Sequence, residues 1–203
     1  MNTLVIAPFT DLGLTQLKTI GGVTYEPWTD TQMLYHPDDL GRRLTDEGFE
    51  ALIVEADFLF EELFEAAKGL RIAAICRAAL NQVDLSAATE QGVAIIHTPG
   101  RNAQAVAELV LGQLLGLARH IPAATRFVVS REWQDPTEAY IRFRGRELGG
   151  ATLGLVGLGQ IGIRVARLGR AVGMRVLAFD PYVTTNSRAA PHVESCPLER
   201  LLG

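Results

Sequence analysis

The sequence is poor in cysteine, in aromatic residues and in long uninterrupted apolar runs. Its two cysteines, Cys76 and Cys196, stand far apart among 203 residues and form no CxxC pair, which predicts ordinary thiols of a cytoplasmic protein and neither a disulfide framework nor a metal site. The most apolar stretch, residues 105–118, is interrupted by Glu108 and Gln113 and falls short of the roughly 18 residues of a membrane span. We therefore expect no membrane partner and interpret this stretch as a buried helix. The start of the chain has no basic region before its short apolar run, unlike a signal peptide.

A strong excess of charge of either sign is also absent. The net charge is −4, with 21% charged and 48% hydrophobic residues, which is an ordinary composition for a globular protein. A mildly acidic balance gives no reason to expect nucleic acid or an anionic membrane as a partner. The length allows one large domain or two small ones.

The first hundred residues alternate apolar, strand-like runs with helical segments. We expect strands within residues 3–9, 23–28, 51–56, 71–76 and 93–98, and helices within 14–20, 37–47, 59–69 and 84–91. Such alternation is typical of a parallel sheet covered by helices on both faces. Pro99-Gly100 then breaks the pattern, a long helix is predicted from about Ala103 to Arg119, and Pro122 marks its approximate end. Residues 130–150 are polar, aromatic and rich in turn residues, and are interpreted as a connecting arm.

Residues 151–180 have the pattern of a dinucleotide-binding strand, turn, helix and strand. Gly157, Gly159 and Gly162 form G-x-G-x-x-G directly after an apolar run. In such a turn the first glycine permits a tight bend, the second lets a pyrophosphate approach the backbone, and the third lets the helix pack closely on the strand. The N-terminus of the helix then favours phosphate at Gln160 and Ile161.

Two further features of this region complete the pattern. An apolar stripe of Ile161, Val165, Leu168 and Val172 predicts the helix face that meets the sheet. Asp180 follows the second apolar run, near the offset of roughly 20 residues expected for the acid that holds the ribose hydroxyls. Its carboxylate would repel a 2′-phosphate, so NAD is predicted over NADP. The competing interpretation is a structural βαβ unit that binds no ligand.

After Ala151 only two strands fit before Gly203, with a helix possible over residues 196–203. A dinucleotide-binding sheet has two halves of about three strands each. We therefore expect a truncated domain, whose edge beside the strand that ends at Asp180 has no partner and is covered by another chain or causes aggregation.

The stretch from Ile75 to Asp180 resembles the D-isomer-specific 2-hydroxyacid dehydrogenases, the family that includes phosphoglycerate, glycerate and formate dehydrogenases. The resemblance rests on residues 83–119, 145–162 and 173–183. It implies a flavodoxin-like, parallel-sheet substrate domain over 1–100, an interdomain helix over 101–120, a connecting and dimerisation arm over 121–150, and the first half of a Rossmann NAD-binding domain over 151–203.

The resemblance also implies roles for particular residues. Gly157, Gly159, Gln160, Ile161 and Gly162 would bind the pyrophosphate, and Asp180 the adenosine ribose. The backbone N–H groups of Arg77, Ala78 and Ala79 would bind the substrate carboxylate. Many relatives have two glycines in this loop, and most have Asn where Gln82 stands here; alanine keeps the N–H donors but disfavours positive φ. A solvated surface arginine is the other interpretation of Arg77.

The resemblance assigns no catalytic residue in this chain. The family uses an arginine, a glutamate and a histidine from the second half of its nucleotide domain and beyond, and none of His36, His97, His120 and His192 fits that motif. We therefore expect the front part of an NAD-dependent dehydrogenase for a 2-hydroxy or 2-oxo acid, inactive by itself because no group exchanges the hydroxyl proton.

Two alternatives stay open. One is a non-catalytic NAD-binding regulator or scaffold. The other is a functional domain over 1–100 followed by a dimerisation module. Trp133, Tyr140 and Phe143 fit a homodimer contact, or pack within the chain.

Overall fold

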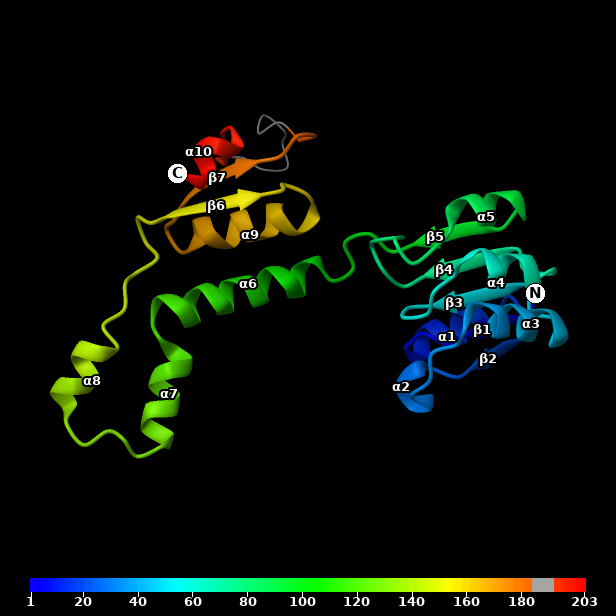
Figure 1. The fold of residues 1–203 in the computed structure, drawn as a ribbon, viewed down its shortest axis with the longest axis horizontal. Coiled ribbons are helices and arrows are strands. Elements are labelled where there is room, and N and C mark those ends of the chain that lie inside the picture. Colours follow the sequence, from blue (N-terminus) through cyan, green and yellow to red (C-terminus); the bar gives the residue numbers. More distant parts are fainter. Residues whose placement is uncertain (184–191) are drawn as a thin grey trace. The chain divides into compact units, whose positions relative to one another are not determined.

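The computed structural model describes residues 1–183 and 192–203. The chain divides into two compact units, Met1–Arg101 and Asn102–Gly203; the strands and helices of each are labelled in Figure 1. In the described part of the chain, no helix is both long enough and apolar enough to cross a membrane.

The first unit is built on a five-stranded parallel sheet. Its strands are β1 (Thr3–Val5), β2 (Val23–Tyr25), β3 (Ala51–Val54), β4 (Ile72–Ile75) and β5 (Ala94–His97). They lie in the order β2-β1-β3-β4-β5, and every neighbouring pair is parallel. This is the flavodoxin-like order, so the predicted α/β class is confirmed. The strand order reverses between β1 and β3, which matters below because ligands of such sheets bind at that point.

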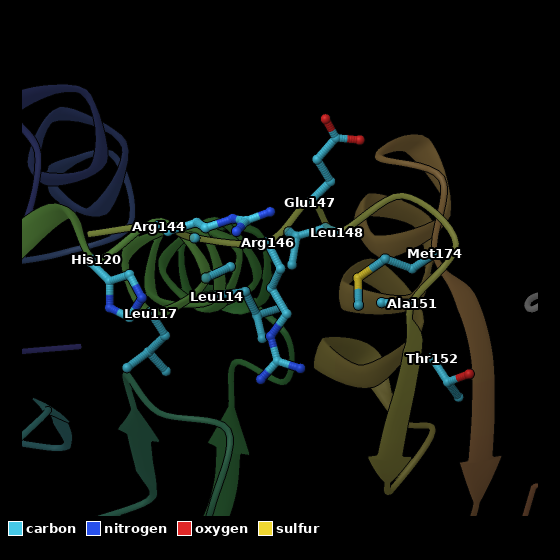
Figure 2. Close-up of a pocket in the computed structure, with 12 residues that line it drawn as sticks. Leu114, Leu117, His120, Arg144, Arg146, Glu147, Leu148, Ala151, Thr152 and Met174 are labelled. Atoms are coloured by element: carbon cyan, nitrogen blue, oxygen red, sulfur yellow. The ribbon is translucent and has the colours of Figure 1, made fainter. Parts of the chain in front are cut away.

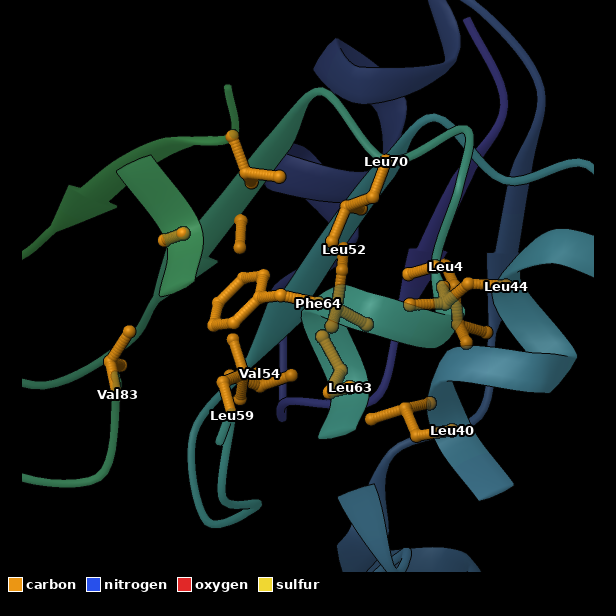
Figure 3. Packing of buried hydrophobic residues seen from close by; sticks show 14 of the residues in the cluster. Leu4, Leu40, Leu44, Leu52, Val54, Leu59, Leu63, Phe64, Leu70 and Val83 are labelled. Carbon is orange, nitrogen blue, oxygen red and sulfur yellow. The ribbon is translucent and has the colours of Figure 1, made fainter. Parts of the chain in front are cut away.

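Helices cover both faces of this sheet, but unequally. They are α1 (Asp11–Lys18), α2 (Trp28–Thr31), α3 (Pro37–Asp46), α4 (Glu61–Ala66) and α5 (Leu85–Glu90); the short α2 is not among the helices predicted from the sequence. The larger core lies between one sheet face and α3, α4 and α5, and Figure 3 shows its closely packed side chains, among them Leu4, Leu40, Leu44, Leu52, Val54, Leu63 and Phe64. The opposite face has a smaller core around Val5, Ala7 and Ile53, against Leu17 of α1.

The second unit begins with helices and ends in a three-stranded sheet. The helices are α6 (Ala103–Ala118), α7 (Ile121–Val129), α8 (Pro136–Arg142), α9 (Gln160–Ala171) and α10 (Leu198–Leu202). The strands are β6 (Thr152–Val156), β7 (Arg175–Phe179) and β8 (Glu194–Ser195), parallel and in the order β6-β7-β8.

The third strand corrects two predictions from the sequence. We expected only two strands after Ala151 and an unpaired edge beside the strand that ends at Asp180. Instead, Leu177 and Ala178 of β7 pair with Glu194 and Ser195 of β8. β7 is therefore the central strand, and the edges of this sheet among the described residues belong to β6 and β8. The two residues of β8 have no apolar run, so no periodic pattern could reveal them.

The helix α9 meets the sheet with a different face from the one predicted. Ile163 and Ala166 belong to the core that it forms with β6 and β7, and a Cβ on Gly169 would lie 2.8 Å from Leu153 Cδ2. The predicted stripe that begins at Ile161 is thus displaced around the helix. Small residues at 166 and 169 let α9 approach the strands closely, and hydrophobicity alone does not show this.

The expectation of a buried helix at residues 105–118 was wrong within this chain. One side of α6 packs against α9, but only Ala103 and Ala107 are buried, and the side chain of Leu117 is 74% exposed. The helix is apolar around most of its circumference, but other elements of this chain cover only part of that apolar surface.

Part of the segment interpreted as a connecting arm is helical, because residues Pro136–Arg142 of it form α8. The predicted helix is confirmed as α6, which ends at Ala118 with Arg119 as its C-cap, and Pro122 also lies in the first turn of α7, where proline is tolerated. The rings of Phe127 and Phe143 meet with centroids 5.2 Å apart, while Tyr140 is 72% and Trp133 56% exposed. Of the three aromatic residues considered for a subunit contact, Phe143 therefore packs within the chain and the other two do not.

Candidate functional site

The glycine turn follows the end of β6 and has a backbone that its sequence makes possible. Gly157 has φ +97°, a conformation that residues with a side chain rarely adopt. Its N–H donates to the carbonyl oxygen of Phe179, 2.8 Å away at the end of β7. The turn is thereby fixed to both strands at their carboxyl ends.

The other two glycines of the motif serve different purposes. A Cβ on Gly162 would lie 2.2 Å from the carbonyl oxygen of Gly157, so only glycine allows α9 to start this close to the turn. A Cβ on Gly159, the N-cap of α9, would have no atom within 4 Å. Gly162 is therefore required by packing, while Gly159 leaves open space beside the backbone.

The N-terminus of α9 presents backbone donors next to that space. The first bond at the start of the helix runs from the N–H of Ile163 to the carbonyl oxygen of Gly159, at 3.0 Å. The N–H groups of Gln160, Ile161 and Gly162 have no partner among the described residues. No acidic residue lies in the first turn, and Arg164 Nη1 donates to the carbonyl oxygen of Gln160 at 2.7 Å. Free N–H groups, the helix dipole and a nearby cation all favour an anion here.

Asp180 lies beside the glycine turn, directly after β7. Its Oδ2 accepts the N–H of Leu158 at 2.7 Å, and its Oδ1 accepts those of Tyr182 and Val183 at 2.8 and 2.9 Å. These bonds, the one from Leu158 first, hold the pKa of the carboxyl below its usual value, because they stabilise the ionised form. A negative charge thus has a fixed place beside the turn, and the predicted cofactor residues come together in one site.

The predicted substrate loop lies in the first unit, after β4. Arg77, Ala78 and Ala79 are exposed, and their N–H groups have no partner among the described residues. Two of their carbonyl oxygens, in contrast, are hydrogen-bonded. His97 Nδ1 hydrogen-bonds to the carbonyl oxygen of Ala78 at 2.9 Å, and the N–H of Thr98 donates to the carbonyl oxygen of Arg77 at 3.0 Å. A short loop with fixed carbonyls and free donors has the properties needed to bind a carboxylate.

A polar cluster beside this loop has no counterpart among the predicted site residues. Glu55, directly after β3, forms an ion pair with Arg101 through Oε1 and accepts Trp28 Nε1–H at 3.3 Å through Oε2. The buried Gln82 donates through Nε2 to the carbonyl oxygens of Glu55 at 3.0 Å and Asp57 at 2.9 Å. The only signal in the sequence was a charged residue directly after a buried strand.

The second unit also contains an open cavity of about 570 Å³. Figure 2 shows Leu114, Leu117 and Met174 on its walls, with His120, Arg144 and Arg146 around them. Thr152, the first residue of β6, lines it, whereas the glycine turn follows the last residue of that strand. The cavity therefore lies at the opposite end of β6 from the anion site. Among the described residues, no group of three or more His, Cys, Asp or Glu side chains could hold a metal ion.

Comparisons with known proteins agree on one family. Residues 111–203 match the family model "D-isomer specific 2-hydroxyacid dehydrogenase, NAD binding domain". A Bacillus subtilis protein named as a 2-hydroxyacid dehydrogenase, YoaD, is 35% identical over 185 residues, which are 90% of this chain and 54% of that protein. The D-3-phosphoglycerate dehydrogenase of Rattus norvegicus is 37% identical over 75% of this chain and 28% of its own length.

A solved structure is also similar over nearly the whole chain. D-lactate dehydrogenase from Escherichia coli superposes with a TM-score of 0.73 at 30% identity, over 99% of this chain and 61% of that one. The chain thus spans 54% of the length of the Bacillus subtilis protein and 28% of that of the rat enzyme.

Proposed function

Because residues 111–203 belong to the NAD-binding-domain family of the D-isomer-specific 2-hydroxyacid dehydrogenases, we propose that the protein is an NAD-dependent oxidoreductase that interconverts a 2-hydroxy acid and its 2-oxo acid. The observation that carries this proposal is the glycine turn with Asp180 hydrogen-bonded to its backbone. The chain spans 54% of its relative from Bacillus subtilis, so the activity proposed is that of the whole protein.

The second unit would hold the cofactor. The open space at Gly159 and the free N–H groups of Gln160, Ile161 and Gly162 fit a pyrophosphate, and the Asp180 carboxylate fits the adenosine ribose. The charge of this unit also suits an anionic cofactor. Residues 102–203 contain 12 basic and 8 acidic residues, whereas residues 1–101 contain 7 basic and 15 acidic ones. When bound, NAD supplies the carbon that accepts or donates the hydride.

The first unit would hold the substrate. The free N–H groups of Arg77, Ala78 and Ala79 would bind its carboxylate, which fixes one end of the molecule. The family's catalytic arginine, glutamate and histidine match no position in these 203 residues. The groups described here therefore bind and orient, and the proton of the hydroxyl group is exchanged by residues that are not among them.

We also propose that two copies of the protein pair through the helices α6, α7 and α8. The exposed apolar side chains of these helices include Leu109, Leu117, Ile121, Val128, Val129, Tyr140 and Ile141. A monomer rarely leaves so many apolar residues in contact with water. A cytoplasmic location fits the two free thiols, Cys76 and Cys196.

The test of the proposed function has two parts. The first measures NADH and NADPH binding to the 203-residue chain by fluorescence; the expected result is binding of NADH and at least tenfold weaker binding of NADPH, because Asp180 repels the 2′-phosphate. Asp180→Asn should reduce this preference, while Asp135→Asn, on the arm, should not change it.

The second part measures NADH oxidation by the full-length protein with a panel of 2-oxo acids. Turnover of at least one of them is expected. NADH binding without any turnover would refute the dehydrogenase and support an NAD-binding regulator instead.

A further inference from the structure

The first unit has an apolar pocket of about 460 Å³ at the carboxyl edge of its sheet. Trp28, Thr29, Gln32, Met33, Leu34 and Ala56 line it. Trp28 begins α2, and its N–H donates to the carbonyl oxygen of Ile6, the residue after β1, at 2.9 Å. Ala56 follows β3. The pocket therefore lies where β1 and β3 end, which is the point where the strand order reverses and where sheets of this kind bind ligands.

Glu55 connects this pocket to the loop at Arg77. Its carboxylate holds the indole of Trp28, which forms part of the pocket wall, and pairs with Arg101. Burial raises the pKa of the Cys76 thiol, and the charges of Arg101 and Glu55 both lie close enough to act on it. Since Cys76 directly precedes Arg77, the pocket, the Glu55 carboxylate and the loop with free N–H groups are neighbours along one edge of the sheet.

We propose that this pocket receives the side chain of the 2-oxo acid, and that Glu55 excludes acids whose side chain carries a negative charge. The inference rests on the proposed function, in which the N–H groups of residues 77–79 bind the carboxylate at the other end of the substrate. The substrates are then 2-hydroxy and 2-oxo acids with an uncharged aliphatic side chain. Phosphorylated and dicarboxylic acids are rejected.

The charges at the site support this selection. The side chain of Glu55 is only 15% exposed, so water screens its charge less than at an open surface. The nearby cation, Arg101, is already paired with this carboxylate and is not available to an anionic side chain. The residues that line the pocket itself are apolar or neutral; Met33 and Leu34 expose more than half of their surface, which an aliphatic chain would cover.

The experiment compares rates of NADH oxidation by the full-length protein. The substrates are 4-methyl-2-oxopentanoate, pyruvate, 3-phosphohydroxypyruvate and oxaloacetate. We expect kcat/KM for 4-methyl-2-oxopentanoate to exceed that for both charged acids by at least about tenfold. Equal or higher kcat/KM for a charged acid would overturn the inference and leave the proposed function standing.

Two variants locate the cause of the selectivity. Glu55→Gln keeps the shape of the side chain and removes its charge, so kcat/KM for 3-phosphohydroxypyruvate should rise about tenfold relative to pyruvate. Glu90→Gln, an exposed carboxylate on α5, should leave the ratio unchanged. Met33→Ser should lower kcat/KM for 4-methyl-2-oxopentanoate but not for pyruvate, and Leu12→Ser, on the exposed face of α1, should lower neither. Unchanged ratios in both Glu55→Gln and Met33→Ser would refute the assignment.

A binding measurement decides the inference without turnover. The chain has two tryptophans, Trp28 and Trp133, whose indole N–H signals can be followed by NMR. Titration with 4-methyl-2-oxopentanoate should shift the Trp28 signal saturably and leave that of Trp133 unchanged, and 3-phosphohydroxypyruvate should shift neither. If no 2-oxo acid oxidises NADH, the proposed function fails, and this titration alone decides whether the pocket is a site for such acids. A Trp28 signal that does not move, or moves more with the phosphorylated acid, overturns the inference.

Discussion

Replacement of Gly162 by alanine should separate the packing role of the glycine turn from its binding role. The added Cβ would lie 2.2 Å from the carbonyl oxygen of Gly157 and 3.1 Å from its carbonyl carbon. The close limit for a carbon and an oxygen is about 3.3 Å, so the start of α9 must move by about 1 Å. Both neighbours are backbone atoms, and no side chain can rotate away to relieve the contact.

The expected loss of stability follows from two opposing contributions. Alanine favours a helix over glycine by about 1 kcal/mol, whereas forcing extra volume into a packed site costs about 1–3 kcal/mol and sometimes more. We expect the steric cost to prevail because the turn is held on both sides, by the bond from Gly157 to Phe179 and by the helix core. Because the contact is with backbone at 2.2 Å, the steric cost lies at the upper end of this range, and Gly162→Ala should lower the free energy of unfolding by about 1–2 kcal/mol net and also weaken NADH binding.

Two matched substitutions provide the controls. A Cβ on Gly159 or on Gly112, in α6, meets no atom within 4 Å. Gly159→Ala should leave stability nearly unchanged but weaken NADH binding, because it fills the space proposed for the pyrophosphate. Gly112→Ala should leave NADH binding unchanged and raise stability slightly. Urea unfolding and NADH fluorescence titration of all three variants are the measurements. A stable Gly162→Ala variant, or a Gly159→Ala variant with unchanged NADH affinity, would refute the reasoning.

Three further predictions concern other parts of the chain. The pKa of Asp180 is lowered in the folded state, so its contribution to stability is present above the ordinary value of 3.8 and is lost as the pH falls through the lowered one; Asp180→Asn should flatten the decline in melting temperature below about pH 4. Gln82→Leu removes the donor to two buried carbonyl oxygens and should lower the free energy of unfolding by about 1–3 kcal/mol in urea, whereas the exposed Gln16→Leu should have little effect. Sedimentation velocity should give twice the mass of the chain for the wild type and a monomer for Leu117→Glu, with Leu12→Glu, equally exposed on α1, still dimeric; a monomeric wild type would contradict the proposed pairing.

The strands of the first unit could be predicted because buried parallel strands are short apolar runs between breaks. Other elements gave weaker signals. Asp135 caps α8 by accepting the N–H of Thr137, with Pro136 next to it, and this start signal was present in a segment dominated by polar residues. Pro122 follows the end of α6 as predicted, but it also lies in the first turn of α7, which was not predicted, because proline fits the first turn of a helix as well as the residues that follow one. The strand β8 exists only because β7 offers it a partner.

The cofactor site and the Glu55 cluster also differ in how well the sequence predicts them. The glycine turn is local, since one stretch contains the bend, the close approach and the helix N-terminus, and so its chemistry can be inferred from spacing. The cluster of Glu55, Trp28 and Arg101 comes from three segments that are joined only in the fold. No periodicity connects residues 28, 55 and 101, and the pocket beside them could not be predicted from the sequence.

One physical rule nevertheless connects the binding groups of both units. In a parallel sheet all carboxyl ends lie at the same edge, so residues that directly follow different strands become neighbours. Gly157 follows β6 and Asp180 follows β7, while Glu55 follows β3 and Cys76 follows β4. Recognition of the cofactor and the proposed selection of the substrate then depend on different strand ends in different units. The glycine turn can therefore stay constant across a family while the residues after β3 and β4 change, and a shared cofactor does not imply a shared substrate. By this argument, Glu55→Gln should change which 2-oxo acids the protein accepts and leave its affinity for NADH the same.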